Sequence, residues 1–174
     1  RTAEISVQPG LPGHRVPPTC HPNNASSAVT RLRDMGMEPY LITSTLLGAF
    51  GQRLVRKTCP ACSVDVPVEK ELFAKYDLEA HGFEPGMALP HGRGCKACFD
   101  TGYSGRIGVY EYLKVDEQIR HQILDHQDAH EIEAYAVSCG MKTMWSDGLE
   151  KVRQGKTTLD ELLRVVGGDD HAGI

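Results

Sequence analysis

Two pairs of cysteines are the residues of this chain with the clearest chemistry. Within each pair two residues separate the thiols, and the pairs are Cys59 with Cys62 and Cys95 with Cys98. Two such pairs bring four sulfur donors to one ion, and four thiolates form the closed tetrahedral shell of structural zinc sites. Because protein fills all four positions, no catalytic water has a place on the ion. The spacing therefore predicts a structural Zn²⁺ site.

Other uses of the cysteines are less favoured. Six cysteines in total allow three disulfides, but paired spacing is typical of metal sites. A thioredoxin-type redox role needs a pair at the start of a helix after a strand, and neither pair has that context. His91 lies close enough in sequence to compete as a ligand, although a solvated loop histidine is the favoured interpretation. Cys139 is expected to be a buried small hydrophobe at the end of an apolar helical face.

Composition restricts the class of protein. The 174 residues allow one ordinary domain with a small inserted subdomain, and 40% hydrophobic residues predict a core. A net charge of −4 argues against a general nucleic-acid binder. The sequence has no apolar run of roughly 18 residues and no secretory signal pattern, so a reducing cytosol is expected. Because Arg1 rather than Met opens the chain, we expect a fragment of a longer protein.

A phosphate-binding loop is suggested and then rejected at Gly155, Lys156 and Thr157. A Walker A motif needs a glycine five residues before this glycine, where the chain has Glu150. It also needs a preceding strand, whereas the pattern before Gly155 is helical. We therefore expect Gly155 to end one helix and the threonines to start the next.

The first third of the chain is predicted to be mainly helical. The proline-rich residues 9–22 are expected to be irregular, and a helix should run from the cap at Asn24 to Gly36. Pro39 is expected to open a longer apolar helix that reaches Val55 and the first cysteine pair. Arg53 and Arg56 would then lie three residues apart on one helix, where they could bind a phosphate or solvate the helix end.

The remaining elements follow from caps and apolar spacing. Between the cysteine pairs we expect a short helix near 69–76 and a loop over 81–94 rich in glycine and proline. A two-glycine turn at 101–106 should precede a strand at 109–115. Four capped helices are then predicted, starting at Asp116, at Asp128 with Glu131, at Thr143, and at Thr158 with Glu161.

Several stretches together resemble a known family. The sequence resembles the C-terminal portion of the ATPases of type II secretion and type IV pilus assembly, and within them the secretion ATPase GspE. The matching stretches occur in the expected order and cover nearly all of residues 1–166: 2–8, 28–39, 52–56, 94–98, 101–111, 147–155 and 157–161.

The resemblance implies a fold and a role. The implied fold is α/β: the C-terminal part of a RecA-like P-loop ATPase domain, with an inserted four-cysteine zinc subdomain and a helical C-terminal region. The family is a hexamer on the cytoplasmic face of the inner membrane, where it works with platform proteins of the secretion machine. The implied divisions are 1–57 for the ATPase core, 58–106 for the zinc subdomain, 107–166 for the C-terminal strand and helices, and 167–174 for a disordered tail.

Two departures from the family limit what this chain should do alone. The Walker A and Walker B residues should lie upstream of residue 1, so ATP and Mg²⁺ belong to the full-length parent. The family's histidine box corresponds to residues 19–23, which makes His21 the candidate catalytic residue. However, Pro17, Pro18 and Pro22 intrude where the family has a strand.

The sequence is compatible with two functions. The leading one is a fragment of a secretion ATPase that contributes the zinc subdomain and contacts with other subunits, without a membrane span or nucleic-acid partner of its own. Arg53 and Arg56 are candidates for nucleotide phosphate or subunit contacts. The rival is a free-standing zinc-ribbon module that binds protein or nucleic acid, although basic residues are not interleaved with aromatic ones as such binding favours.

Overall fold

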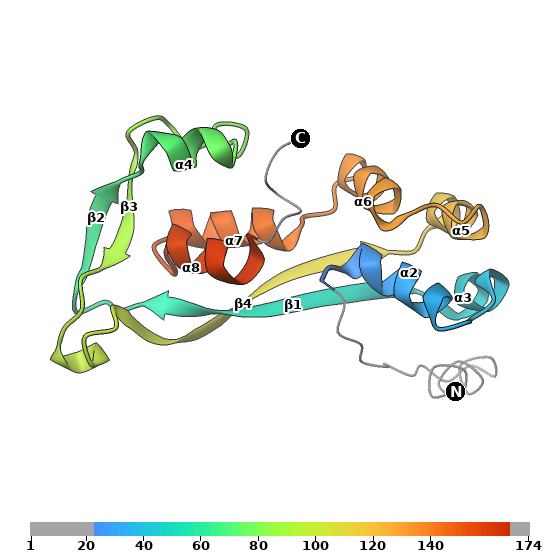
Figure 1. The fold of residues 1–174 in the computed structure, drawn as a ribbon, viewed down its shortest axis with the longest axis horizontal. Coiled ribbons are helices and arrows are strands. Elements are labelled where there is room, and N and C mark those ends of the chain that lie inside the picture. The colour runs from blue at the N-terminus through green and yellow to red at the C-terminus, as the bar shows by residue number, and fades with distance from the viewer. Residues whose placement is uncertain (1–22, 168–174) are drawn as a thin grey trace. The chain divides into compact units, whose positions relative to one another are not determined.

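Residues 23–167 are described in a computed structural model, and they form two compact units. Unit 1 contains residues up to Gly51 together with Glu111–Thr143, and unit 2 contains Gln52–Tyr110 together with the residues from Met144 onward. Strands β1 (Gly48–Thr58) and β4 (Tyr103–Lys114) pair with each other and contribute residues to both units (Figure 1). The predicted irregular segment, His21 and the predicted tail beyond Gly167 lie outside the described residues.

The described residues of unit 1 form mainly four helices, whose starts were predicted from their caps or, for α3, from Pro39. They are α2 (Ala25–Asp34), α3 (Pro39–Thr45), α5 (Glu117–Leu124) and α6 (Ala129–Ser138). The Asn24 side chain accepts a hydrogen bond from the Ser27 amide at 2.7 Å, which confirms the cap of α2. Asp128 and Glu131 form the predicted capping box of α6. The core of this unit is made of Ala25, Val29, Met37, Ile42, Leu113, Val115, Ile119, Ile123, Ile132 and Ala136.

The predicted helix from Pro39 to Val55 is wrong beyond Thr45, because β1 takes over at Gly48. Each glycine costs a helix about 1 kcal/mol relative to alanine, and this segment has two. The strand also uses them for close packing: a Cβ on Gly51 would lie 2.7 Å from Cγ of Glu111. Arg53 and Arg56 therefore stand on a strand, and the helical proximity of residues three apart does not apply to them.

Unit 2 contains a second pair of strands that the sequence did not reveal. Strand β2 (Ser63–Pro67) pairs antiparallel with β3 (Ala88–Gly92). The prediction of a loop over 81–94 is wrong at β3, and no strand was predicted at β2; each strand carries a proline, and prolines are rare inside ladders. The short helix α4 (Lys70–Lys75) follows β2, which confirms the helix predicted near 69–76, and the 3₁₀ turn η2 (Lys96–Cys98) precedes β4.

Helices α7 (Met144–Arg153) and α8 (Leu159–Val166) complete unit 2 and pack against each other. Their contact is close, since a Cβ on Gly148 would lie 2.2 Å from Cδ1 of Leu162. Trp145, Leu149 and Val152 of α7 are buried. The core of this unit is made of Val55, Leu78, Phe83, Leu89, Val109, Trp145, Leu149, Val152, Leu159 and Leu162.

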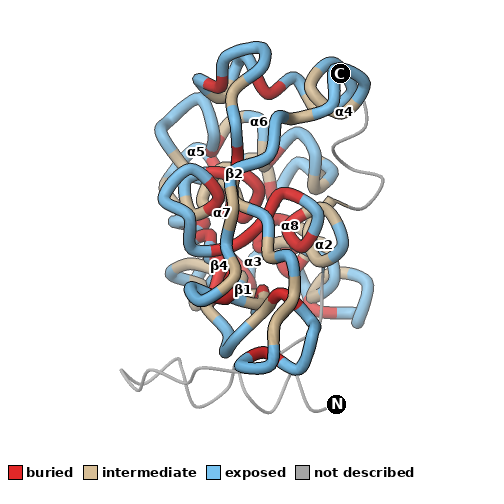
Figure 2. The backbone as a smooth tube through the Cα atoms, turned by 90° about the vertical axis from the view of Figure 1, so that its left-hand side faces the viewer, coloured by how far each residue is buried: buried red, intermediate tan, exposed pale blue. Residues whose placement is uncertain are grey.

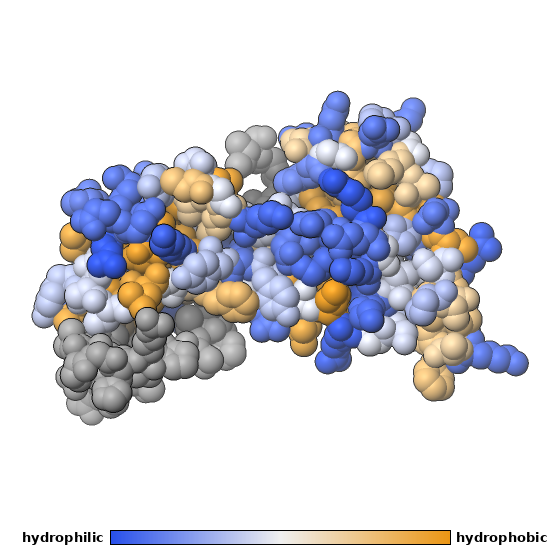
Figure 3. All heavy atoms as spheres, turned by 180° about the vertical axis from the view of Figure 1, so that it is seen from behind, coloured by the Kyte–Doolittle hydropathy of each residue, from blue (hydrophilic) through white to orange (hydrophobic). Residues whose placement is uncertain are grey.

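The exposure of one cysteine differs from its prediction. Cys139 is exposed at the C-terminal end of α6, so its interpretation as a buried hydrophobe is wrong. Figure 2 shows buried residues within the helices and strands and mainly exposed ones in the connecting turns. On the face shown in Figure 3, hydrophilic residues alternate with small hydrophobic areas. Within residues 23–167, no helix combines the length and the apolar character that crossing a bilayer requires.

Candidate metal centre

The two cysteine pairs flank the β2–β3 ladder of unit 2. Cys59 and Cys62 lie between β1 and β2, whereas Cys95 and Cys98 lie between β3 and β4. The ladder pairs Ser63 with Gly92, so the residue that follows the first pair is opposite one that shortly precedes the second. Pairing of the strands thus closes the long loop between the two pairs and brings four thiols together.

The distances between the sulfur atoms fit a tetrahedral ion. The Sγ atoms of Cys59, Cys62, Cys95 and Cys98, the four-cysteine cluster, all lie within 4.8 Å of one another. Sγ of Cys98 is 3.8 Å from that of Cys62 and 3.7 Å from that of Cys95. A tetrahedron with zinc–sulfur bonds of about 2.3 Å has edges of about 3.8 Å, whereas a disulfide bond is about 2.05 Å long. All four cysteines are free thiols, so the cluster fits a metal ion and contradicts disulfides among them.

Backbone donors surround one of the thiols. The amides of Cys95 and Gly102 donate to Sγ of Cys98 at 3.2 Å and 3.3 Å. Burial raises the pKa of the Cys98 thiol, but these hydrogen bonds outweigh it and hold the pKa at about 6. Burial and the neighbouring thiols instead raise the pKa of Cys62 to about 12. A bound cation would balance the charge of four thiolates held this close together.

Two glycines allow the backbone around the cluster to close. A Cβ on Gly102 would lie 2.4 Å from the carbonyl oxygen of Gly92, and one on Gly92 would lie 2.1 Å from the carbonyl oxygen of Gly102. Gly102 also has a φ of +77°, which favours glycine. In addition, the amide of Cys59 donates to the Gly102 carbonyl at 2.9 Å and joins the two cysteine pairs. The sequence showed the glycine turn but not this contact.

The residue after the second pair has an unusual backbone. Phe99 adopts a left-handed conformation, with φ of 53° and ψ of 44°, and its side chain is largely in solvent at 88% exposure. This conformation costs a bulky residue about 1 to 2 kcal/mol. The cost is imposed by the turn, in which the amides of Phe99 and Asp100 donate to the carbonyls of Lys96 and Cys95.

The structure places the other predicted site residues away from the sulfur atoms. Among residues 23–167, the group that can hold a metal ion contains the four cysteines and not His91. Nδ1 of His91 instead lies 3.6 Å from a carboxylate oxygen of Asp160, and both side chains are at least half exposed. Arg53 is half-buried on β1.

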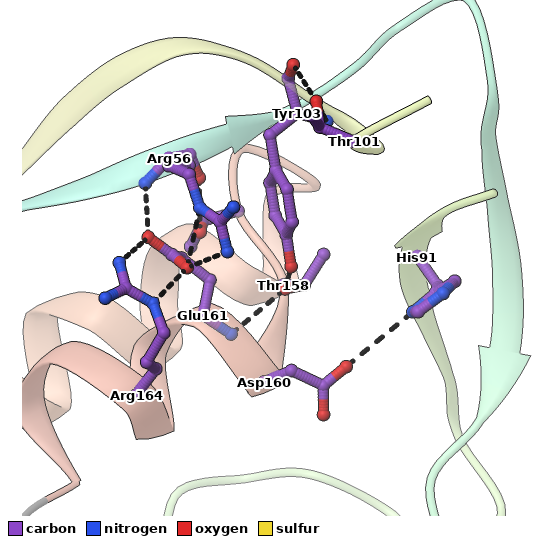
Figure 4. Close-up of polar contacts among 9 residues, drawn as sticks. Arg56, His91, Thr101, Tyr103, Thr158, Asp160, Glu161 and Arg164 are labelled. Carbon is purple, nitrogen blue, oxygen red and sulfur yellow. Dashed lines mark hydrogen bonds and ion pairs between the residues drawn. The ribbon is translucent and has the colours of Figure 1, made fainter. Parts of the chain in front are cut away.

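Arg56 takes part in an ion cluster around the buried Glu161, and sequence reasoning missed this cluster (Figure 4). Its Nε and one terminal nitrogen donate to Oε2 of Glu161 at 2.9 Å and 2.7 Å, and its backbone amide donates to Oε1 at 3.0 Å. Arg164 donates to the same carboxylate at 2.8 Å and 2.7 Å. The Glu161 side chain is fully buried, which raises its pKa, but the two arginines more than compensate and lower it to about 2.

The cluster continues from the arginine to an aromatic ring and to the turn between α7 and α8. The guanidinium carbon of Arg56 lies 4.0 Å from the centre of the Tyr103 ring, and the Tyr103 hydroxyl is 2.8 Å from that of Thr158. Thr157 donates its hydroxyl to the Arg56 carbonyl at 2.8 Å. Gly155 lies two residues after the end of α7 at Arg153, and the amide of Thr58 donates to the Lys156 carbonyl at 3.1 Å. This turn is therefore structural, as expected.

Comparisons with known proteins identify the family of the chain. The family model described as "Type II/IV secretion system protein" matches residues 1–164. The chain belongs to this family. It is 44% identical over 93% of its length to the type IV pilus assembly ATPase PilB of Thermus thermophilus, and 43% identical over 94% to the type II secretion system ATPase E of Vibrio cholerae. It is also 37% identical over 95% of its length to the type IV pilus assembly ATPase TfpB of Acinetobacter baylyi.

The chain spans only a minor part of these relatives. The aligned region is 18% of the Thermus protein, 32% of the Vibrio protein and 28% of the Acinetobacter protein. The family model establishes the family of this chain. The structure adds a mixed helix and strand fold and a cysteine cluster compatible with zinc.

Proposed function

We propose that this chain is the C-terminal part of a secretion or pilus-assembly ATPase and contributes a zinc-stabilised lobe to it. The observation that carries the proposal is the four-cysteine cluster, whose sulfur spacing matches a tetrahedral zinc site. Membership of the secretion family supports the wider context. Bound Zn²⁺ would supply charge balance and cross-linking rather than catalysis, because protein ligands fill its shell.

The proposal assigns ATP hydrolysis to the parent protein and not to these residues alone. In the parent, a RecA-like core would bind ATP and Mg²⁺, with His21 and Arg53 as candidate contacts. The lobe would contribute to contacts with other copies in a hexamer and with platform proteins at the cytoplasmic face of the inner membrane. Arg56 is the weaker phosphate candidate, since the Glu161 carboxylate already occupies its guanidinium.

Metal analysis of the purified chain tests the site. We expect one zinc per chain, loss of that zinc in Cys95→Ser, and retention in the matched control Cys139→Ser, whose thiol is exposed outside the cluster. Replacement of zinc by Co²⁺ should give the absorption of a tetrahedral thiolate complex. A wild-type chain without affinity for zinc, or a Cys95→Ser variant that keeps it, would contradict the proposal.

Measurements of nucleotide and nucleic-acid binding test whether ATP hydrolysis belongs to the parent protein and not to this chain alone. The isolated chain should neither bind nor hydrolyse ATP, measured by calorimetry and by phosphate release. Nucleotide binding at micromolar affinity would overturn this part of the proposal. Salt-dependent binding of DNA or RNA at similar affinity would favour the rival zinc-ribbon module instead.

A further inference from the structure

Two residues near the cysteine pairs are bonded to the start of α8, a helix that is distant in the sequence. Arg56 lies three residues before the first pair, and Tyr103 lies five residues after the second. Both contact the beginning of α8: Arg56 through Glu161, and Tyr103 through Thr158. The stacking of Arg56 on Tyr103 connects the two contacts into one network (Figure 4).

The end of β1 is bonded both to the α7–α8 turn and to the turn that follows the second cysteine pair. Its last residues bond to the α7–α8 turn through the Thr58 amide and through the Arg56 carbonyl. Directly after β1, the amide of Cys59 bonds to Gly102 of the second cysteine pair's turn. A shift of the end of β1 would therefore move the first cysteine pair relative to the second.

The Glu161 carboxylate binds two arginines instead of the amide of the cap residue. A glutamate three residues after a threonine cap usually accepts from the cap amide and completes a capping box. Here the Glu161 amide donates to the Thr158 hydroxyl, but the carboxylate binds Arg56 and Arg164. Burial of a carboxylate is unfavourable unless charged donors surround it, and here the two guanidinium groups donate four hydrogen bonds to it, with a fifth from the Arg56 backbone amide.

We propose that Glu161 is a positioning residue for the metal centre: through Arg56 and Tyr103 it holds the two cysteine pairs at the spacing that an ion requires. The inference rests on the proposed zinc site. Groups that are hydrogen-bonded to metal ligands typically change metal affinity by about 10- to 100-fold, and we expect Glu161, which acts through Arg56, at the lower end of that range. Because coupling between two equilibria is reciprocal, zinc must stabilise the docking of α8 by the same factor.

The affinity of the chain for zinc, measured by competition with a chromogenic chelator, tests the first half. Glu161→Gln should bind zinc about tenfold more weakly than the wild type. The matched control is Glu84→Gln, which removes the same charge from an exposed position of the same unit and should leave the affinity unchanged. Equal affinities of a folded Glu161→Gln variant and the wild type would overturn the proposal.

A milder variant keeps the test decisive if Glu161→Gln does not fold. Arg56→Lys retains the charge but loses the two-pronged hydrogen bond, and it should give an affinity between those of the wild type and Glu161→Gln. An Arg56→Lys affinity equal to that of the wild type would contradict the proposal. The Co²⁺ spectrum of each variant should keep its tetrahedral form, because all four ligands are intact.

Hydrogen exchange tests the reciprocal half. Removal of zinc by a chelator should increase amide exchange in α8 of the wild type, and the increase should be much smaller in Glu161→Gln. Absence of zinc binding by the wild type would refute the metal centre itself. Zinc binding with no change of exchange in α8 would refute only the positioning role of Glu161.

Discussion

At the residue scale, the metal centre depends on two glycines, which have no side chain, as well as on the four cysteines. The carbonyls of Gly92 and Gly102 approach each other's α-carbons so closely that neither position has room for a methyl group. This contact lies beside Cys98, whose Sγ accepts a hydrogen bond from the Gly102 amide. Glycine is therefore required here for close approach of the two backbones as well as for a positive φ.

Gly102→Ala separates these two requirements when it is compared with Gly86→Ala. Both glycines have a positive φ, but an added Cβ meets no atom within 4 Å at Gly86 and meets the Gly92 backbone at Gly102. We expect Gly86→Ala to lower the free energy of unfolding by about 1 kcal/mol, and Gly102→Ala to lower it by at least twice as much, because backbone must also move. Urea denaturation of the zinc-bound proteins measures both. Equal effects would show that the close contact is not important.

Phe99→Gly should stabilise the chain. Glycine removes the cost of the left-handed backbone, and loss of the phenyl group sacrifices little packing because the side chain is 88% exposed. We expect a gain of about 1 kcal/mol in the free energy of unfolding by thermal or urea denaturation. The control Phe99→Ala removes the ring but keeps the strain, so its stability should change little. A gain in both variants would attribute the effect to the ring instead.

At the element scale, the contact between β1 and α8 predicts a pH dependence with a definite sign. The pKa of Glu161 falls from 4.5 to about 2 on folding, so its ion cluster stabilises the chain fully above pH 4.5 and loses that contribution as the pH falls toward 2. At neutral pH the contribution is roughly 2 kcal/mol, less than the shift alone suggests because both arginines are partly exposed.

Urea unfolding of the wild type and of Glu161→Gln at several pH values measures this contribution, with chelator in all samples so that metal release does not enter. The difference in unfolding free energy should be largest above pH 4.5 and should shrink steadily at lower pH. A difference that is constant down to pH 2 would show that the carboxylate is not the group responsible.

The same elements show why some of the fold could be predicted and some could not. Asn24 and Asp128 cap their helices through bonds to residues three positions away, and such local signals can be read directly from the sequence. Strand β1 depends on pairing with β4, and its apolar residues also suited a helix. Glu161 looked like the second half of a capping box, but its partner Arg56 is 105 positions away in the chain.

In the candidate site, too, local features could be predicted from the sequence and long-range contacts could not. Spacing within the pairs identified the four-cysteine cluster, because the geometry of two thiols on one turn is local. The glycine contact and the network around Arg56 depend on which strands pair, and pairing could not be inferred from loops that contain prolines. Cys139 was misassigned because the last turn of an amphipathic helix can leave its core, as α6 does.

At the scale of the whole molecule, each unit has its own hydrophobic core, and only one of them contains the metal ligands. The only tryptophan of the sequence, Trp145, is buried in the core of unit 2, whereas helices of both units contribute to circular dichroism. Fluorescence therefore follows the unit with the cysteines, and the dichroism signal follows both.

Removal of zinc should separate these two signals during thermal unfolding. With a chelator, we expect the tryptophan fluorescence to change at a lower temperature than the dichroism, because a ligand that binds only the folded state stabilises the unit that holds it. Ile132→Val, in the core of unit 1, should instead lower the later part of the dichroism transition and leave the fluorescence midpoint in place. Coincident midpoints under all conditions would indicate one cooperative unit.

The register of the β2–β3 ladder restricts where this chain can change in length. Its pairs run from Ser63 with Gly92, beside the cysteines, to Pro67 with Ala88 at the opposite end. One residue inserted within either strand would reverse the faces of all positions beyond it and displace one cysteine pair relative to the other. Residues 68–87, which include α4, join the strands at the end away from the thiols. A change of length there, outside the buried Leu78 and Phe83, leaves the register of the ladder unchanged, so we expect this segment to tolerate insertions that the strands do not.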